Sequence, residues 1–145
     1  MFLYKRAQIF VGDVWGCFGG SGLGGFGDSI AGLTMFADYR VPVVLRGMGV
    51  LHYSEALGVA LELGVTVPAG SAPELEIRAC TIQAVERLKR ALGGRIAAGG
   101  GVLEVEGGSD WGGLTSVAID WFLWNEGETA RDASPPHHKT LTVYY

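Results

Sequence analysis

The sequence predicts a mainly α-helical domain built from short helices that are joined by tight, glycine-rich turns. Apolar residues recur at intervals of three and four along most of the 145-residue chain, as on one face of a helix. Ser, Pro and Gly repeatedly occur where these periodic segments start and end. The chain also holds 24 glycines, whereas glycine averages about 7% of residues in proteins, so many turns and sharp helix ends are expected.

The first predicted helix covers "KRAQIFVGDVWGCF" (5–18) and ends at Gly19–Gly20. Its apolar residues fall on one face: Ala7, Val11, Val14, Trp15 and Phe18. The glycines at positions 20, 22 and 25 that follow match the spacing of a dinucleotide-binding loop. That fingerprint needs a strand before it, and here a helix precedes it, so a flexible connection is the preferred interpretation.

A second helix is expected over "DSIAGLTMFADY" (28–39), capped by Asp28 or Ser29. Pro42 fits only the first turn of a helix, so a third helix should start just before it, in "RVPVVLRGMG" (40–49). Asp38 is therefore expected at the junction of two short helices. Taken alone it is best explained as a cap, but an Asp held at a helix N-terminus is also rigid and ionised, as a catalytic carboxylate must be.

The remaining segments continue the helical pattern. A short helix is expected over 54–64 with Ser54 as its cap, and a longer one over 71–94 with a capping box formed by Ser71 and Glu74. This longer region is either one kinked helix or two. Segment 93–108 is glycine-rich, and "VLEVE" within it indicates a hairpin or a loop. A helix over 114–128 is apolar almost all round and is expected to be buried, and the tail after it ends extended.

Composition limits the classes of function. The formal net charge is −4 and the pI is about 5.3, which disfavours a protein that binds long nucleic acids through Lys and Arg but leaves room for a small phosphorylated ligand. Cys17 and Cys80 show no metal or redox spacing, so they are expected to be buried free thiols in a reducing compartment. No apolar run reaches the ~20 residues of a membrane span, and no signal-peptide order is seen, so a cytoplasmic location is expected.

A few residues are candidates for chemistry. A rigid, ionised Asp38 facing a cleft would suit cleavage of an N-glycosidic bond, because it can stabilise the positive charge that develops on the sugar or orient the attacking water. Lys5 and Arg6 either bind a substrate phosphate or form a solvated helix start. The three histidines lack metal-ligand spacing, so no metal is expected. Asp120 lies within an apolar helix and needs a partner there; a structural hydrogen-bonding role is preferred over a catalytic one.

Six motifs occur in an order that resembles one known family, the queuosine salvage proteins, or queuosine 5′-phosphate N-glycosylases. They are "KRAQIFVGDVW.CF" (5–18), "LTMFADYRVPVVL" (33–45), "G.L.YSE" (49–55), "E.EIRAC.IQAVE" (74–86), "DW.LW" (120–124) and "PPHHKT...YY" (135–145). The resemblance spans nearly the whole chain and rests on several collinear motifs. Members of this family are considerably longer, so the chain is expected to be a single helical domain (1–145) equivalent to the C-terminal part of such a protein.

The resemblance implies hydrolysis of queuosine 5′-monophosphate to release queuine, which a separate transglycosylase inserts into tRNA. It implies a fold similar to helix-hairpin-helix DNA glycosylases, with no cofactor. The family's catalytic Asp falls on Asp38, and its motif Lys falls on Lys5, near the substrate. His138 is assigned to substrate binding, and Tyr39 and Arg40 either line the pocket or brace the helix junction.

Two other functions are kept open. The chain could be a truncated member that only binds queuine or its nucleotide, or one that needs a second chain or a missing N-terminal half to complete the site. A helix-hairpin-helix module that binds nucleic acid is a further alternative, which the acidic net charge disfavours. No membrane partner is expected.

Overall fold

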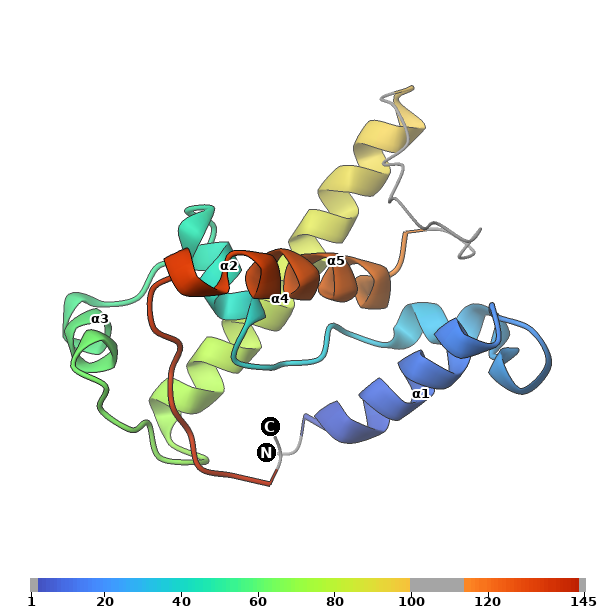
Figure 1. The fold of residues 1–145 in the computed structure, drawn as a ribbon. Coiled ribbons are helices and arrows are strands. Elements are labelled where there is room, and N and C mark those ends of the chain that lie inside the picture. The colour runs from blue at the N-terminus through green and yellow to red at the C-terminus, as the bar shows by residue number, and fades with distance from the viewer. Residues whose placement is uncertain (1–2, 100–113, 144–145) are drawn as a thin grey trace.

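The computed structural model describes residues 3–99 and 114–143, and these residues form a helical fold (Figure 1). The α-helices are α1 (Lys5–Cys17), α2 (Val41–Gly47), α3 (Glu55–Glu62), α4 (Ala72–Ala97) and α5 (Ser116–Thr129). Three 3₁₀ helices cover Gly22–Gly24, Gly27–Gly32 and Arg131–Ala133. Pairing between extended segments in the described ranges is limited to one isolated parallel bridge, Thr66–Lys139. The mainly α class predicted from the sequence is confirmed.

The core lies where α2, α4 and α5 pack against one another. In Figure 1, α5 crosses the long diagonal α4, and α2 lies against both. The main buried cluster comprises Met35, Ala37, Val41, Leu45, Leu51, Ala84, Val85, Ile119 and Leu123. A second cluster joins α1 to α5 through Trp15, Ile30, Phe36 and Val117, with the rings of Trp15 and Trp121 stacked at a centroid distance of 6.0 Å. Residues 35–37 contribute to both clusters and thus link the two halves of the core.

The helix expected over 28–39 is wrong. The 3₁₀ helix Gly27–Gly32 occupies its start, and residues 33–38 are extended. Side chains of three other helices hydrogen-bond to the backbone of this segment, which is why it needs no helical bonds of its own. The N–H of Thr34 donates to Gln8 Oε1 (3.0 Å), and the N–H of Phe36 donates to Asp120 Oδ1 (3.1 Å). Arg78 Nε donates to the carbonyl of Ala37 (3.1 Å).

Helices α2, α3 and α4 form close to where the sequence places them. Pro42 lies in the first turn of α2, and Ser54 Oγ accepts the N–H of Leu57 at the start of α3. Helix α4 is one continuous helix that runs to Ala97, so the glycine-rich loop expected from residue 93 begins later. The hairpin or loop predicted at "VLEVE" (102–106) lies outside the described residues.

The capping box at the start of α4 is wrong. The Ser71 side chain makes no capping hydrogen bond, and Glu74 instead accepts the N–H of Gly70 with its Oε2 atom (3.1 Å). Glu74 also forms an ion pair with Arg78 at 2.9 Å. A buried charged partner four residues further along the helix therefore determines where the Glu74 side chain points.

Burial differs from expectation at three places. The side chains of Phe122 and Trp124 are 47% and 42% exposed, so α5 is buried on one face only. Cys17 and Cys80 are both exposed free thiols, not buried ones. In each case the apolar or thiol character of the residue predicted burial, but the opposite face of the same helix supplies the core contacts.

Candidate active site

Asp38 is buried where the extended segment turns into α2. Its Oδ1 atom accepts the N–H groups of Arg40 (3.1 Å) and Val41 (3.0 Å), and the residue is only 5% exposed. These donors belong to the start of α2, where backbone N–H groups lack helical partners. Asp38 thus holds the start of this helix, as the sequence suggested, while being fixed in one position.

Asp120 is a second buried carboxyl group, and it comes from the middle of α5. It is 4% exposed, and its Oδ1 atom accepts the N–H of Phe36, which lies 84 residues earlier in the chain. The expected hydrogen-bonding partner therefore exists. The segment that Asp120 holds leads directly to Asp38, and the charge of the Asp38 carboxylate raises the pKa of Asp120.

Lys5 lies within electrostatic range of both carboxyl groups. It is the first residue of α1 and is half-buried. Burial lowers the pKa of its ammonium group, while the negative charges of Asp38 and Asp120 oppose that shift. The three side chains belong to three separate parts of the sequence and come within electrostatic range of one another in the fold.

The proton affinities of the two carboxyl groups are perturbed to different degrees. Burial raises the pKa of Asp38, but the N–H of Val41, the charge of Lys5, and the N–H and charge of Arg40 all act to lower it. Burial and the neighbouring Asp38 raise the pKa of Asp120 to about 8, against a single N–H donor and the charge of Lys5. Asp120 is therefore the member of the pair that keeps its proton at neutral pH.

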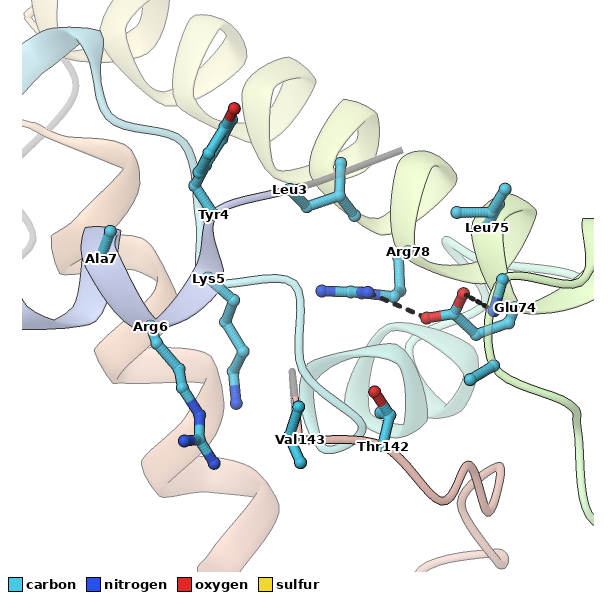
Figure 2. A pocket seen from close by; sticks show the side chains of 12 residues that line it. Leu3, Tyr4, Lys5, Arg6, Ala7, Glu74, Leu75, Arg78, Thr142 and Val143 are labelled. Carbon is cyan, nitrogen blue, oxygen red and sulfur yellow. Dashed lines mark hydrogen bonds and ion pairs between the residues drawn. The ribbon is translucent and has the colours of Figure 1, made fainter.

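A cavity of about 590 Å³ opens between the start of α1 and the start of α4 (Figure 2). Figure 2 shows the side chains of Lys5 and Arg78 extending into the same space from α1 and α4. Its lining residues are Leu3, Tyr4, Lys5, Arg6, Ala7, Ala69, Gly70, Glu74, Leu75, Arg78, Thr142 and Val143. The wall thus holds three cationic side chains, the N-terminal end of α1 and one carboxylate, Glu74, which is paired with Arg78. The excess of positive charge suits an anionic ligand.

Tyr39 and Arg40 lie in a neighbouring cluster and do not line this cavity. The Arg40 guanidinium donates from Nε to Glu128 Oε1 at 2.7 Å, which ties the start of α2 to the end of α5. Tyr39 packs its ring against that of His137, with centroids 4.7 Å apart, and the Arg40 guanidinium lies 5.5 Å from the Tyr39 ring centroid.

His138 is 2% exposed, and burial lowers the pKa of its imidazole to about 4. The charges of Glu74 and Arg78, which line the cavity, also act on it. His138 is therefore a neutral, buried group within electrostatic range of two cavity residues, and it is not itself among the residues that line the cavity.

Two functional candidates were missed or undervalued from the sequence. Arg78 was not singled out, although it is buried and contacts both the cavity and the Asp38 segment. The signal available was an Arg four residues after a Glu in a segment expected to be helical. Asp120 carried a clearer signal, a carboxylate inside an apolar helix, but its proximity to Asp38 follows only from the tertiary fold.

In residues 3–99 and 114–143 no group of three or more His, Cys, Asp or Glu side chains is arranged to hold a metal ion. Among the same residues, no helix is long and apolar enough to cross a bilayer.

Together, these features define a class of protein: a helical domain with a cation-lined cavity and a pair of buried carboxyl groups of unequal proton affinity. Neither carboxyl group lines the cavity, but both lie within electrostatic range of Lys5 in its wall. Such pairs suit acid–base and electrostatic catalysis on a small anionic substrate. The chain belongs to the queuosine salvage protein family, whose family model matches residues 1–145. The family resemblance predicted from the motifs is thereby confirmed.

Individual relatives agree with this assignment. The chain is 46% identical over 145 residues to a Dictyostelium discoideum protein named queuosine 5′-phosphate N-glycosylase/hydrolase, covering 100% of this chain and 40% of the relative. Proteins of the same name from Sphaerobacter thermophilus and Bos taurus are 44% and 38% identical, over 98% of this chain and 39% and 40% of theirs. The chain thus spans about two-fifths of the length of these curated relatives.

Proposed function

We propose that this chain hydrolyses the N-glycosidic bond of queuosine 5′-monophosphate and releases queuine for salvage into tRNA. The observation that carries the proposal is the buried Asp38 carboxylate at the start of α2, with Lys5 of the cavity wall in electrostatic range. The name shared by the relatives supports the substrate and the reaction.

Asp38 supplies the negative charge that this reaction needs. As the bond from ribose C1′ to the base nitrogen breaks, the base takes the bonding electron pair and positive charge develops on the sugar ring. Both N–H groups that bind Asp38 donate to Oδ1, so Oδ2 is the atom we assign to stabilising that charge or orienting the attacking water. A carboxylate that is already fixed in position does this without reorganising during the reaction.

Asp120 supplies the complementary proton. With a pKa of about 8 it carries a proton at neutral pH, and its Oδ1 atom is occupied by the N–H of Phe36. We assign Oδ2–H of Asp120 to the departing base, so that the base leaves neutral while the water that adds to C1′ loses its proton to the ionised carboxylate of the pair. One buried acid and one buried base thus balance the hydrolysis.

The cationic cavity wall accounts for the phosphate. Lys5 and Arg6 lie in the first turn of α1, where the helix dipole also favours negative charge. Tyr39, Arg40 and His138 complete the proposed set of substrate-binding residues. Because Arg40 is already bound to Glu128, we expect it to act by bracing Tyr39 and the start of α2.

The direct test is to incubate the purified chain with queuosine 5′-monophosphate and measure free queuine by mass spectrometry. We expect queuine release from the unmodified chain and a loss of about a hundredfold or more in Asp38→Asn, which removes the charge but keeps an oxygen acceptor. Asp13→Asn, an exposed position on α1, is the matched control and should leave the rate unchanged. Undiminished turnover in Asp38→Asn would exclude the role given to Asp38.

A second candidate is favoured by the length comparison. Because the chain spans about two-fifths of its relatives, it could bind queuine or its nucleotide without turnover, or need a second polypeptide to complete the site. Calorimetry that detects nucleotide binding with no queuine release would favour this candidate. We expect either activity to act on a small molecule, because the net charge of −4 disfavours a nucleic-acid partner. We further propose that it takes place in the cytoplasm.

A further inference from the structure

We propose that Arg78 is a positioning residue for this site: it holds the peptide that precedes Asp38, and Glu74 in turn holds Arg78. The proposal rests on the proposed function, because it assumes that Asp38 is the reacting carboxylate. It concerns side chains of α4, which lie outside the segment that carries the carboxylate.

A continuous chain of hydrogen bonds carries the proposal. Arg78 Nε donates to the carbonyl oxygen of Ala37 at 3.1 Å, and Arg78 Nη1 donates to Glu74 Oε1 at 2.9 Å. Glu74 Oε2 accepts the N–H of Gly70 at 3.1 Å. The chain of contacts therefore runs from the loop before α4, through two side chains of α4, to the backbone next to Asp38.

The carbonyl of Ala37 and the N–H of Asp38 belong to one peptide plane, so the contact with Arg78 fixes the orientation of that plane. This matters because residues 33–38 are extended and lie outside any helix or sheet. Asp120 holds the same segment from α5 through the N–H of Phe36. Two helices thus clamp residues 36–37, and the Asp38 carboxylate follows directly after the clamp.

Burial makes this arrangement rigid. Arg78 and Glu74 are 5% and 3% exposed, so neither charge can leave its partner without an unpaired ion in the interior, which is strongly unfavourable. The planar guanidinium reaches a carbonyl and a carboxylate at fixed angles to each other. A Lys at position 78 keeps the charge but has no such fork, so it cannot reproduce both contacts in the same geometry.

Arg78 also lines the cavity beside Lys5, so a direct contact with substrate is the competing explanation. The two roles separate kinetically. Loss of a substrate contact made equally in ground and transition states raises KM, whereas displacement of Asp38 lowers kcat.

The experiment compares Arg78→Lys and Glu74→Gln with the unmodified chain, using Arg90→Lys as the control, an exposed Arg of the same helix. We expect kcat for queuosine 5′-monophosphate to fall about ten- to hundredfold in Arg78→Lys, with KM changed less than threefold. Glu74→Gln should give a smaller fall in kcat of the same kind, and Arg90→Lys should give none. An increase in KM with unchanged kcat would overturn the positioning role.

A second measurement needs no turnover. The Asp38 carboxyl is titrated by NMR in the free protein, where Lys5 and Arg40 are the neighbouring charges and Asp120 is the neighbouring carboxyl group. Arg78→Lys should raise the Asp38 pKa, because a displaced carboxylate loses the N–H bonds that stabilise its charge, whereas Arg90→Lys should leave it unchanged. An unchanged Asp38 titration in folded Arg78→Lys refutes the positioning role. If the unmodified chain releases no queuine, the proposed function fails, and this titration still decides the positioning.

Discussion

Asp38 and Asp120 are nearly equally buried, at 5% and 4% exposed. Their surroundings nevertheless stabilise the ionised carboxylate to different degrees. Asp38 accepts two N–H groups at the start of a helix and lies near two cations, Lys5 and Arg40. Asp120 lies in the middle of a helix, accepts one N–H, and faces the negative charge of Asp38. Burial alone therefore does not assign the roles. The number of donors and the charges nearby raise the proton affinity of Asp120 well above that of Asp38, as the proposed division into an acid and a base requires.

The largest effect is expected when the carboxyl proton of Asp120, the proposed acid, is removed. Asp120→Asn keeps an oxygen that can accept the N–H of Phe36 but cannot donate a carboxyl proton. We expect kcat to fall about a hundredfold at neutral pH. The pH–rate profile of the unmodified chain should decline above about pH 8, where Asp120 loses its proton, and this basic decline should be absent in the variant. A profile that keeps its basic decline in Asp120→Asn would assign that titration to another group.

Two glycines pack closely against residues that contact the two carboxyl groups. A Cβ at Gly127 of α5 would lie 2.6 Å from Arg40 Cγ, beside Asp38, whereas a Cβ at Gly12 of α1 would lie 2.6 Å from Phe36 Cζ, on the residue that donates to Asp120. Both distances are shorter than real contacts. We expect Gly127→Ala and Gly12→Ala each to lower the free energy of unfolding by about 1–3 kcal/mol, measured by urea denaturation.

Gly93→Ala in α4 is the matched control, because a Cβ there meets nothing within 4 Å. It should stabilise the protein by about 0.5–1 kcal/mol, the usual gain for Gly to Ala inside a helix. If all three substitutions stabilise the protein, the close packing of α1 and α5 on the Asp38 segment is wrong. If Gly12→Ala and Gly127→Ala lower the free energy of unfolding while Gly93→Ala raises it, packing outweighs helix propensity at the first two positions.

Much of the fold could be predicted from the sequence because its helices carry local signals. Pro42 and Ser54 mark the starts of α2 and α3, and both are confirmed. Residues 28–39 show why such signals fail elsewhere. Their apolar spacing is compatible with a helix, but the backbone of residues 34–37 is bound by Gln8, Arg78 and Asp120, which lie far away in the sequence. No local pattern reports those partners.

The candidate site shows the same division. Asp38 and Lys5 could be proposed from motifs. Their roles in the site stay predictions, which Asp38→Asn and Lys5→Met test. That Asp120 is held to the Asp38 segment depends on a hydrogen bond between residues 84 positions apart. Its raised proton affinity follows from that neighbour and from burial, two properties of the tertiary structure.

The proton held by Asp120 should also appear in the stability of the protein. A carboxyl whose pKa is raised from 3.8 to about 8 on folding binds more protons when folded, so its contribution to stability is full below about pH 4 and is lost as pH rises towards 8. Asp120→Asn removes this dependence. Between pH 5 and pH 8 the variant should gain about 3–4 kcal/mol relative to the unmodified chain, measured by urea denaturation at both pH values. An equal difference at the two pH values would contradict the assigned protonation.

The smallest expected effect is the change in the pKa of Asp38 and Asp120 when the positive charge of Lys5 is removed. Lys5 lowers the pKa of both Asp38 and Asp120, so Lys5→Met should raise the pKa of both carboxyl groups in NMR titrations of the free protein. Arg6→Met is the matched control: Arg6 lines the same cavity but is exposed and is not among the charges that shift either carboxyl group. It should leave both titrations in place. If Lys5→Met moves neither pKa, the burial of the two groups and their mutual repulsion account for their difference without the cation, and Lys5 serves the cavity alone.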